Sequence, residues 1–275
     1  MEKIIITENL TQYRLIEALD RVSYYTSAFL YHNKGQGVLI DSGYRRLGQF
    51  IKKDIDQSNI VLKAIVITHY HKDHAEGSTV FKNVPIIASD LYEDTFMKCQ
   101  NVTTYELVIP NILVEDKYLI NIDTSRIEIF KTPGHTNCGL SVLINNDYLY
   151  VSDNLLEDIN NKIIVPYLDV SSNPYEHYKT IYEYQYLQFK TLLLTHGQVK
   201  SNRNLKSEFG ERLFYLENFI KSEFTKDIDE CLQNDPENYS MTAIHKINVR
   251  NAKKYVSVQP TSFFESMNAS QRNSD

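Results

Sequence analysis

The chain is poor in cysteine, lacks long apolar runs and does not begin like a secreted protein. Its three cysteines, Cys99, Cys138 and Cys231, are odd in number, widely spaced and outside any C-x-x-C pair, a pattern that argues against a disulfide framework. No run approaches the roughly 18 apolar residues that span a bilayer. The apolar stretch within Met1–Thr7 is too short for a signal peptide. We therefore expect a cytoplasmic protein with buried free thiols.

Positive charge is also scarce. The 275 residues carry 29 Lys and Arg against 35 Asp and Glu, a net charge of −6, which argues against a general nucleic-acid binder. Apolar residues make up 42% and charged residues 23%, the ordinary balance of a globular protein. We expect a small-molecule substrate and no membrane partner. The sequence leaves the oligomeric state open, with a homodimer as one option.

One stretch concentrates the chemistry of the chain. An H-x-H-x-D-H string, made of His69, His71, Asp73 and His74, follows the apolar run Ile60–Ile67 directly. The run is short and rich in β-branched residues, as in a strand buried on both faces of an α/β domain. The string then occupies a strand-to-helix loop, which can aim several side chains at one point. Imidazole nitrogen with carboxylate oxygen suits zinc, iron or manganese.

Four further candidates stand where apolar strands are predicted to end. Asp41 follows Val38–Ile40, and His135 lies in a Pro-Gly turn after a strand ending at Phe130. Asp153 and His196 also follow short apolar runs. In α/β sheets, sites assemble at the edge where strands end. We therefore expect these side chains to meet the H-x-H-x-D-H string.

Periodicity and turn residues predict the remaining elements. The predicted strands are 3–7, 27–31, 38–40, 60–67, 85–88, 120–122, 126–130, 140–144, 148–151 and 191–195. The predicted helices are 47–55, 75–81, 90–101, 175–189, 205–220 and 239–247.

The order of these motifs resembles that of the metallo-β-lactamase-fold hydrolases. The residues that carry the resemblance are Asp41-Ser42-Gly43, the string from His69 to His74, Pro133-Gly134-His135-Thr136, Asp153 and His196-Gly197. The resemblance covers about the first 200 residues and implies an α/β fold, a four-layer αββα sandwich. Residues 1–200 would form this catalytic domain. We expect 201–260 to be a helical C-terminal extension and 261–275, which is polar and rich in Ser and Asn, to be a mobile tail.

The same resemblance assigns roles to the candidate residues. It implies two metal sites with three ligands each, His69, His71 and His135 for one and Asp73, His74 and His196 for the other. Asp153 would bridge the two metals. Asp41 would not bind a metal itself but would orient one of the ligands. Two three-ligand sets that share a carboxylate leave open positions on both metals, as a catalytic site requires. The expected cofactors are two zinc ions, with iron and manganese as alternatives.

Such a centre fits hydrolysis. A hydroxide bridging two metals is a nucleophile at physiological pH, and the metals polarise the substrate carbonyl. Asp73 is the expected catalytic residue, as partner for the proton of the nucleophile. The chemistry suits an ester, thioester or lactone, and it suits a phosphodiester in a phosphodiesterase or nuclease equally well.

The residues around the motifs favour one branch of this family. Asp153 resembles the glyoxalase II, thioesterase and lactonase branch, since true β-lactamases usually carry Cys or Ser there. Leu156 occupies the place where lactonases often have Tyr, which weakens the lactonase interpretation. Lys200, Arg203 and Lys206 either form a solvated surface or bind an anionic group of the substrate. We expect a thioester or ester hydrolase, with a phosphodiesterase, or a mononuclear iron oxygenase of the persulfide dioxygenase type, as alternatives.

Overall fold

Two β-sheets lie face to face at the centre of the protein. The structure is a computed structural model that describes residues 1–100, 107–201, 205, 207–232 and 236–272. Within these residues the first sheet has the order β1 (Glu2–Thr7), β2 (Leu10–Leu19), β3 (Val22–Asn33), β4 (Gln36–Ile40), β5 (Val61–Val66), β6 (Ile86–Ser89) and β7 (Ile112–Val114). The second has the order β13 (Thr191–Leu193), β11 (Tyr148–Tyr150), β10 (Leu140–Ile144), β9 (Ser125–Lys131) and β8 (Lys117–Ile122).

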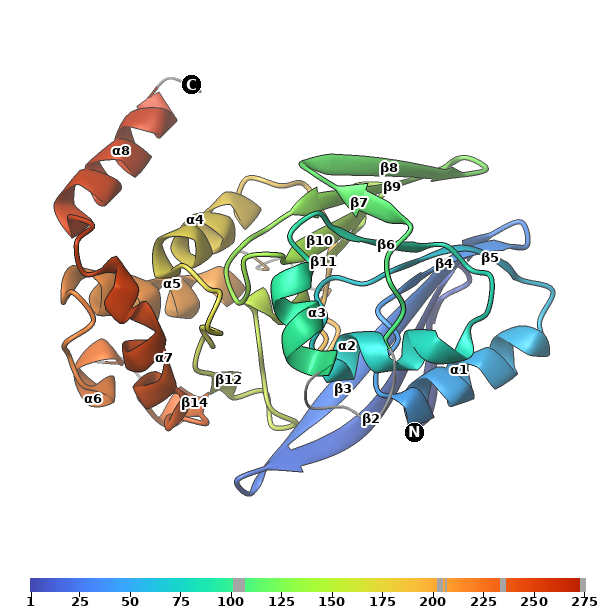
Figure 1. The fold of residues 1–275 in the computed structure, drawn as a ribbon, viewed down its shortest axis with the longest axis horizontal. Helices are drawn as coiled ribbons and strands as arrows, with labels where there is room; N and C mark the ends of the chain where they lie inside the picture. Colours follow the sequence, from blue (N-terminus) through green and yellow to red (C-terminus); the bar gives the residue numbers. More distant parts are fainter. Residues whose placement is uncertain (101–106, 202–204, 206, 233–235, 273–275) are drawn as a thin grey trace.

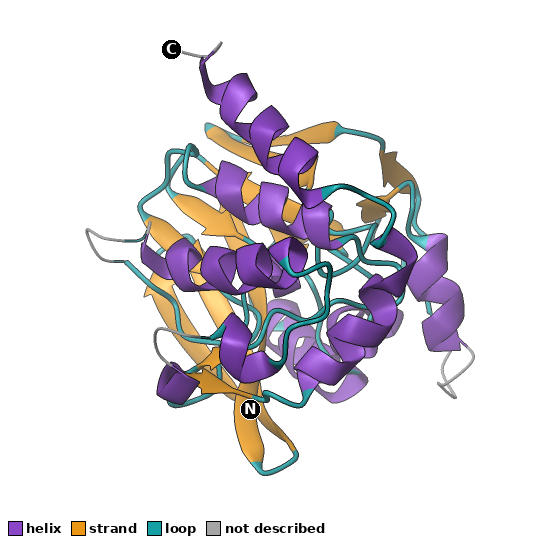
Figure 2. Cartoon of the chain, turned by 90° about the vertical axis from the view of Figure 1, so that its left-hand side faces the viewer, coloured by secondary structure: helices purple, strands orange, loops and turns teal. Residues whose placement is uncertain are grey.

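Helices cover the outer face of each sheet. On the first sheet lie α1 (Arg45–Asp56), α2 (Lys72–Ala75) and α3 (Glu93–Gln100), and on the second lie α4 (Pro174–Tyr184) and α5 (Ser207–Lys221). Figure 1 shows these two groups on opposite sides of the strands, and Figure 2 shows helices in front of the sheet. The predicted four-layer αββα fold is confirmed.

Side-chain alternation along the strands explains the layers. In β4, Val38 and Ile40 enter the core between the sheets, whereas Leu39 faces α1. In β10, Val142 faces the core between the sheets and Leu143 faces the helices on the other side. Successive strand residues point to opposite faces, so strands with apolar residues on both faces are buried between two layers. Each sheet therefore has an inner and an outer core.

The structure corrects several predicted elements. The ten-residue strand β2 was not predicted, because its turn to β3 uses Asp20 and Arg21 at positive φ in place of the Asn-Gly or Gly pairs that mark hairpins. Helix α4 ends at Tyr184, five residues before the predicted end. The predicted helix 75–81 is α2 followed by a 3₁₀ turn, Glu76–Val80. Part of the predicted helix 90–101 lies outside the described residues.

The C-terminal extension is joined to the sandwich by a small sheet. After α5 come α6 (Ile228–Cys231), a strand β14 (Tyr239–Ser240) and α7 (Ile244–Ala252). The prediction of a single helix over 239–247 was therefore wrong at its start. Strand β14 pairs in parallel with β12 (Ile163–Ile164), which belongs to the loop after Asp153. This pairing brings the extension close to the candidate site.

The expected tail is helical where the structure describes it. Helix α8 (Pro260–Arg272) begins at a proline, which is favourable in a first helical turn. Its Phe263 packs edge-on against Tyr175 with ring centroids 4.9 Å apart, and Phe264 packs against Tyr178 at 5.1 Å. The sequence reasoning gave weight to the polar residues and missed these two aromatic anchors. No helix among the described residues has the length and apolar character needed to cross a membrane.

A buried ion pair fixes α5 to the loop that follows Asp153. The Arg212 guanidinium on α5 donates to the Glu157 carboxylate at 2.8 Å, and both side chains are almost fully buried. Lys200 pairs with the same carboxylate at 2.7 Å. The backbone N–H of Glu157 donates to the carbonyl of His196 at 2.8 Å. The extension thus holds the segment that runs between two candidate site residues.

Removing this guanidinium should destabilise the fold strongly. We expect Arg212→Met to lower the free energy of unfolding by about 3–5 kcal/mol, because it leaves a buried carboxylate with a partner missing. Urea unfolding followed by circular dichroism measures the change. The matched control is Lys221→Met, which breaks an exposed ion pair with Glu217 on the same helix and should cost less than about 1 kcal/mol. Equal losses in the two variants would contradict the role of Arg212.

Candidate metal centre

Parallel strand ends bring the candidate residues together. β4 and β5 run in parallel and deliver Asp41 and the H-x-H-x-D-H string to one edge of the first sheet. β11 and β13 also run in parallel and deliver Asp153 and His196 to the facing edge of the second sheet. Strands β9 and β11 are both antiparallel to β10 and therefore point in the same direction. The chain leaving β9 thus brings His135 to the same edge as Asp153. The site forms where the two sheet edges meet.

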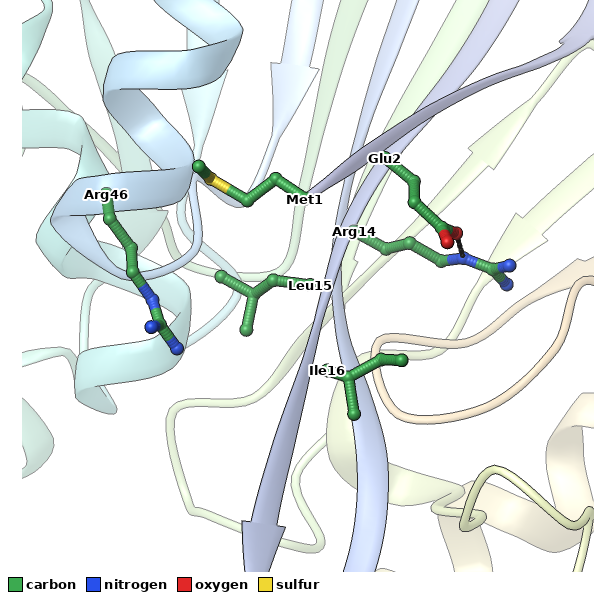
Figure 3. A pocket seen from close by; sticks show the side chains of 6 residues that line it. All are labelled: Met1, Glu2, Arg14, Leu15, Ile16 and Arg46. Atoms are coloured by element: carbon green, nitrogen blue, oxygen red, sulfur yellow. Dashed lines mark hydrogen bonds and ion pairs between the residues drawn. The ribbon is translucent and has the colours of Figure 1, made fainter.

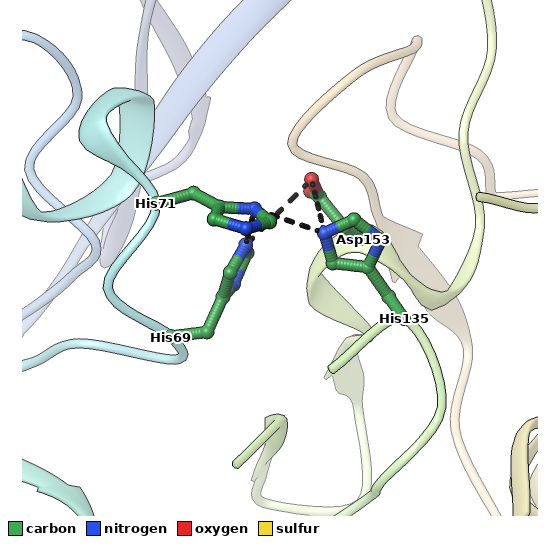
Figure 4. A group of neighbouring side chains, drawn as sticks. All are labelled: His69, His71, His135 and Asp153. Carbon is green, nitrogen blue, oxygen red and sulfur yellow. Dashed lines mark hydrogen bonds and ion pairs between the residues drawn. The ribbon is translucent and has the colours of Figure 1, made fainter. Parts of the chain in front are cut away.

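The first cluster consists of three imidazoles and one carboxylate. His71 Nδ1 lies 3.0 Å from His69 Nε2 and 3.1 Å from His135 Nε2. Asp153 Oδ2 lies 3.6 Å from His135 Nε2 and 3.9 Å from His69 Nε2. Figure 4 shows the three rings and the carboxylate turned toward one another. The four ligand atoms lie within 4.8 Å of one another, close enough to hold one metal ion.

The second cluster shares Asp153 with the first. His196 Nε2 lies 3.1 Å from Asp73 Oδ2 and 3.5 Å from Asp153 Oδ2. His74 Nε2 lies 3.1 Å from Asp153 Oδ1. These four side chains also place their ligand atoms within 4.8 Å of one another. All seven predicted ligands therefore converge, and the carboxylate of Asp153 faces both groups.

Two buried atoms at the centre make no hydrogen bond within the described part of the chain. They are His74 Nε2 and Asp153 Oδ1, whose 3.1 Å contact does not have hydrogen-bond geometry. A buried polar group without a partner costs free energy. A cation between the imidazole and the carboxylate would satisfy both atoms, and nitrogen with oxygen ligands suits a borderline metal such as zinc. The residues present thus fit a metal.

The Asp41 carboxylate orients the His74 ring by binding its Nδ1 atom, the ring nitrogen that does not face Asp153. It accepts hydrogen bonds from His74 Nδ1 at 2.8 Å, from the N–H and hydroxyl of Thr68 at 2.8 Å each, and from the Tyr150 hydroxyl at 2.5 Å. His74 Nε2 is therefore turned toward Asp153. Asp41 has φ 54°, and Ser152, the residue before Asp153, has φ 53°. Such left-handed backbone at non-glycine residues is strained and is common at functional sites.

Other partners fix the remaining rings. His135 Nδ1 donates to the Tyr167 carbonyl at 3.0 Å, and His196 Nδ1 donates to the Tyr25 carbonyl at 2.5 Å. His69 Nδ1 lies 3.3 Å from the Ser152 hydroxyl. A partner on the second nitrogen sets the tautomer and aim of a metal-binding histidine. In these three rings Nε2 is left to face the centre.

A close backbone approach holds the motif loop against the loop after β4. The backbone N–H and the hydroxyl of Ser42 both donate to the His74 carbonyl, at 2.9 Å and 2.8 Å. Gly77 donates its N–H to the Gly43 carbonyl at 2.7 Å. A Cβ on Gly77 would lie 2.1 Å from the Ser42 carbonyl oxygen. Glycine is required there because no side chain fits between the loops.

The four buried histidines of the two clusters separate into two electrostatic classes. Burial lowers the pKa of His135 to about 4, and burial with the neighbouring rings of His74 and His71 holds that of His69 well below its ordinary value. Burial also opposes charge on His196, but the Asp153 and Asp73 carboxylates raise its pKa to about 10. Asp153 and Asp41 likewise raise the pKa of His74.

The two carboxylates of the second cluster stay ionised. Burial favours the neutral acid of Asp73, yet the facing rings of His74 and His196 lower its pKa to about 2. The same two rings hold the pKa of Asp153 well below its ordinary value. In the metal-free protein, protons on His74 and His196 therefore neutralise this pair of carboxylates. A divalent cation would replace those protons as it bound.

A pocket of about 340 Å³ opens onto both clusters. Its described lining includes three tyrosines, Tyr24, Tyr44 and Tyr167, and six apolar side chains, Leu19, Leu156, Ile164, Met241, Ile244 and Ile247. The sequence reasoning did not identify these pocket residues, apart from noting Leu156. Tyr44 is one residue beyond the Asp41-Ser42-Gly43 motif, a signal that could have found it. The others reach the pocket through tertiary packing alone.

The predicted basic cluster after His196 does not line this pocket within the described residues. Lys200 pairs with Glu157 and Glu208 at 2.7 Å each. Arg203 and Lys206 lie outside the described residues. A second hollow of about 310 Å³ lies between β2 and the start of the chain, lined by Met1, Glu2, Arg14, Leu15, Ile16 and Arg46, and none of the metal-site candidates is among its lining residues (Figure 3).

The two classes of histidine can be distinguished by titration. In the metal-free protein at pH 7, we expect both ring nitrogens of His196 to carry protons and His135 to carry one. His196 should lose its proton as the pH rises through about 10, and the stability that its charge contributes should be lost over the same rise, because its folded-state pKa lies above the ordinary 6.5. Long-range ¹H–¹⁵N spectra measure this. A neutral His196 at pH 7 would contradict the arrangement.

Curated relatives match parts of the chain. A hydroxyacylglutathione hydrolase of Prochlorococcus marinus (strain MIT 9312) is 32% identical over 107 residues, 37% of this chain and 39% of that protein. Another protein of that name, from Buchnera aphidicola subsp. Schizaphis graminum (strain Sg), is 28% identical over 177 residues, 64% of this chain and 63% of that protein. The chain thus spans less than two thirds of the length of these relatives.

Solved structures and a family model extend the comparison. A metallo-beta-lactamase from Pontibacter korlensis superposes with a TM-score of 0.64 at 19% identity, covering 79% of this chain and 99% of that one. At this identity the likeness concerns the fold. The sequence model of the metallo-beta-lactamase superfamily matches residues 23–183, which carry Asp41 and six of the seven predicted metal ligands, all but His196. More than half of the chain is matched, and the protein belongs to the metallo-beta-lactamase superfamily.

Proposed function

We propose that the protein is a dinuclear metal-dependent hydrolase that acts on a thioester or ester. The observation that carries the proposal is the position of Asp153, whose carboxylate belongs to both clusters and faces the pocket. Three protein ligands and a shared carboxylate at each position leave room for water and substrate. The complete second cluster argues against the mononuclear iron oxygenase.

The ligand roles follow from the two clusters. His69, His71 and His135 would hold one ion, and Asp73, His74 and His196 the other, with Asp153 between them. Zinc is the metal we favour, since imidazole and carboxylate are its common ligands. Two such ions supply a hydroxide nucleophile at neutral pH and Lewis acidity toward the substrate carbonyl. Asp41 keeps His74 aimed at the centre.

The chain supplies proton transfer and hydrogen bonding around the centre. Asp73 is ionised at neutral pH and lines the pocket, so its carboxylate can accept the proton of the attacking water. Tyr24 and Tyr44 line the same pocket. Burial, with the negative charge of Asp73, raises the pKa of both phenols. Both hydroxyls are therefore protonated donors available to a substrate oxygen.

Two observations support a thioester or ester substrate. The relatives from Prochlorococcus and Buchnera are named for a hydrolase whose substrate is a thioester. The bridging position holds Asp153, as in the glyoxalase II and thioesterase branch that the motifs resemble. A phosphodiester remains the competing substrate, since two metals also suit in-line displacement.

Elemental analysis tests the dinuclear centre. We expect about two zinc ions per chain in the purified protein, as in other two-metal sites, and about one in His196→Ala, because the second cluster loses a nitrogen ligand. His32→Ala is the matched control, since His32 belongs to neither cluster, and it should keep the wild-type metal content. A single iron that is unaffected by His196→Ala would overturn the proposal.

Substrate panels test the reaction. The zinc-loaded protein should hydrolyse simple thioesters and esters, lose that activity with a chelator, and turn over bis(4-nitrophenyl) phosphate at least about 100-fold more slowly, because the site would favour the carbonyl transition state. Release of thiol or nitrophenolate gives the rates. Turnover of the phosphodiester alone would replace the thioesterase proposal with the phosphodiesterase alternative.

A further inference from the structure

The wall of the pocket that faces the two clusters is apolar and is built largely by the C-terminal extension. Met241 follows β14, and Ile244 and Ile247 project from α7. Ile164 on β12, paired with β14, continues this wall, and Leu156 extends it toward Asp153. We call these five residues the apolar wall.

Hydrogen bonds anchor the face of α7 next to the apolar wall. The Asn248 side chain accepts from the Leu168 N–H at 2.9 Å and donates to the Pro166 carbonyl at 2.6 Å. His245, also on this face, lies 3.0 Å from the Tyr215 hydroxyl of α5. Because residues three apart share a helix face, anchoring His245 and Asn248 fixes the direction of Ile244 and Ile247. The apolar wall is therefore held in place as part of the folded core.

Asn248 also connects this wall to the metal-site candidates. The two residues that it holds, Pro166 and Leu168, flank Tyr167. The Tyr167 carbonyl accepts the hydrogen bond from His135 Nδ1. The position of α7 and the orientation of the His135 ring thus depend on the same short segment, residues 166–168. Whatever binds against α7 lies next to the first cluster.

Within the described residues, no Lys or Arg lines this pocket. Two basic side chains that follow His196 are paired with carboxylates outside this lining, since Lys200 contacts Glu157 and Glu208, and Arg212 contacts Glu157. The only acidic residues in the described lining of the pocket are Asp73 and Asp153, and both are predicted metal ligands. An anionic group of the substrate that was buried against the apolar wall would meet apolar side chains and no counter-charge, which is costly.

We propose that the apolar wall binds the uncharged, apolar acyl group of the substrate, and that it disfavours an acyl group that carries a charge. This rests on the ester or thioester hydrolase activity proposed above and names its substrate class. The volume of about 340 Å³ lies at the small end of ligand pockets, so a short or medium acyl chain fits. Specificity then resides in the extension, and the chemistry in the sandwich.

Two matched thioester series test the length and the charge of the acyl group separately. With the zinc-loaded full chain, we expect kcat/KM for acyl thioesters of uncharged N-acetylcysteamine to rise about fourfold per methylene from acetyl to butanoyl, as for burial of apolar surface. Butanoyl N-acetylcysteamine should exceed succinyl N-acetylcysteamine, whose four-carbon acyl group ends in a carboxylate, at least about tenfold. A flat chain-length series, or faster turnover of the succinyl thioester, would overturn the inference and leave the hydrolase proposal standing.

A charged substitution locates the acyl group. Ile247→Asp should reduce the gain per methylene to less than twofold, because a carboxylate in the wall repels apolar chains. Ile5→Asp is the matched control, since Ile5 is exposed on β1 and does not line the pocket, and it should keep the wild-type slope. If the gain in kcat/KM per methylene were unchanged in Ile247→Asp, the proposal that the apolar wall binds the acyl group would be overturned.

A binding measurement separates failure of the inference from failure of the hydrolase proposal. The uncharged fluorophore N-phenyl-1-naphthylamine should bind the metal-free protein, be displaced better by hexanol than by ethanol, and bind Ile247→Asp at least fivefold more weakly. Absence of such binding would overturn the apolar site. Binding as expected without hydrolysis of any ester or thioester would instead overturn the hydrolase activity, and with it the assignment of this wall to a substrate.

Discussion

The carboxylate of Asp41 joins the two halves of the sandwich at the edge where the candidate ligands meet. It follows β4 in the first sheet and accepts hydrogen bonds from His74 and Thr68 on the motif loop and from Tyr150 on β11 of the second sheet. A buried carboxylate is tolerated only when its partners are in place. One charge therefore requires the correct mutual position of both sheets, and the same position brings the two ligand clusters together.

Charge balance at the centre extends this dependence. Despite burial, the carboxylates of Asp153 and Asp73 raise the pKa of His196 to about 10 and that of His74 above its ordinary value, whereas burial lowers the pKa of His69 and of His135. The cluster with two carboxylates therefore has a strong requirement for positive charge, and the cluster of neutral imidazoles offers nitrogen lone pairs. Asp153, shared by both, is the only ligand candidate in the described chain that belongs to the two groups.

Local signals in the sequence predicted the buried strands and the candidate ligands at their ends, whereas the four-layer order was implied by the family resemblance. Apolar runs identify buried strands, and the residue after each run stands at a predictable sheet edge, as Asp41 and His196 do. The pocket could not be predicted in this way. Ile164 and Ile247 become neighbours through the short pairing of β12 with β14, which no periodic pattern marks. The sequence allowed Lys200 to bind an anionic group of the substrate, and only the fold shows that it pairs with Glu157.

The hydrogen bond from His196 to the carbonyl of Tyr25 joins residues 171 positions apart. The second cluster therefore cannot form before His196 has been synthesised, nor before the long β2–β3 hairpin has docked against the strand end that carries His196. Contacts of such sequence separation close late and slowly in folding. The geometry thus predicts that the second cluster is completed only after both sheets have folded.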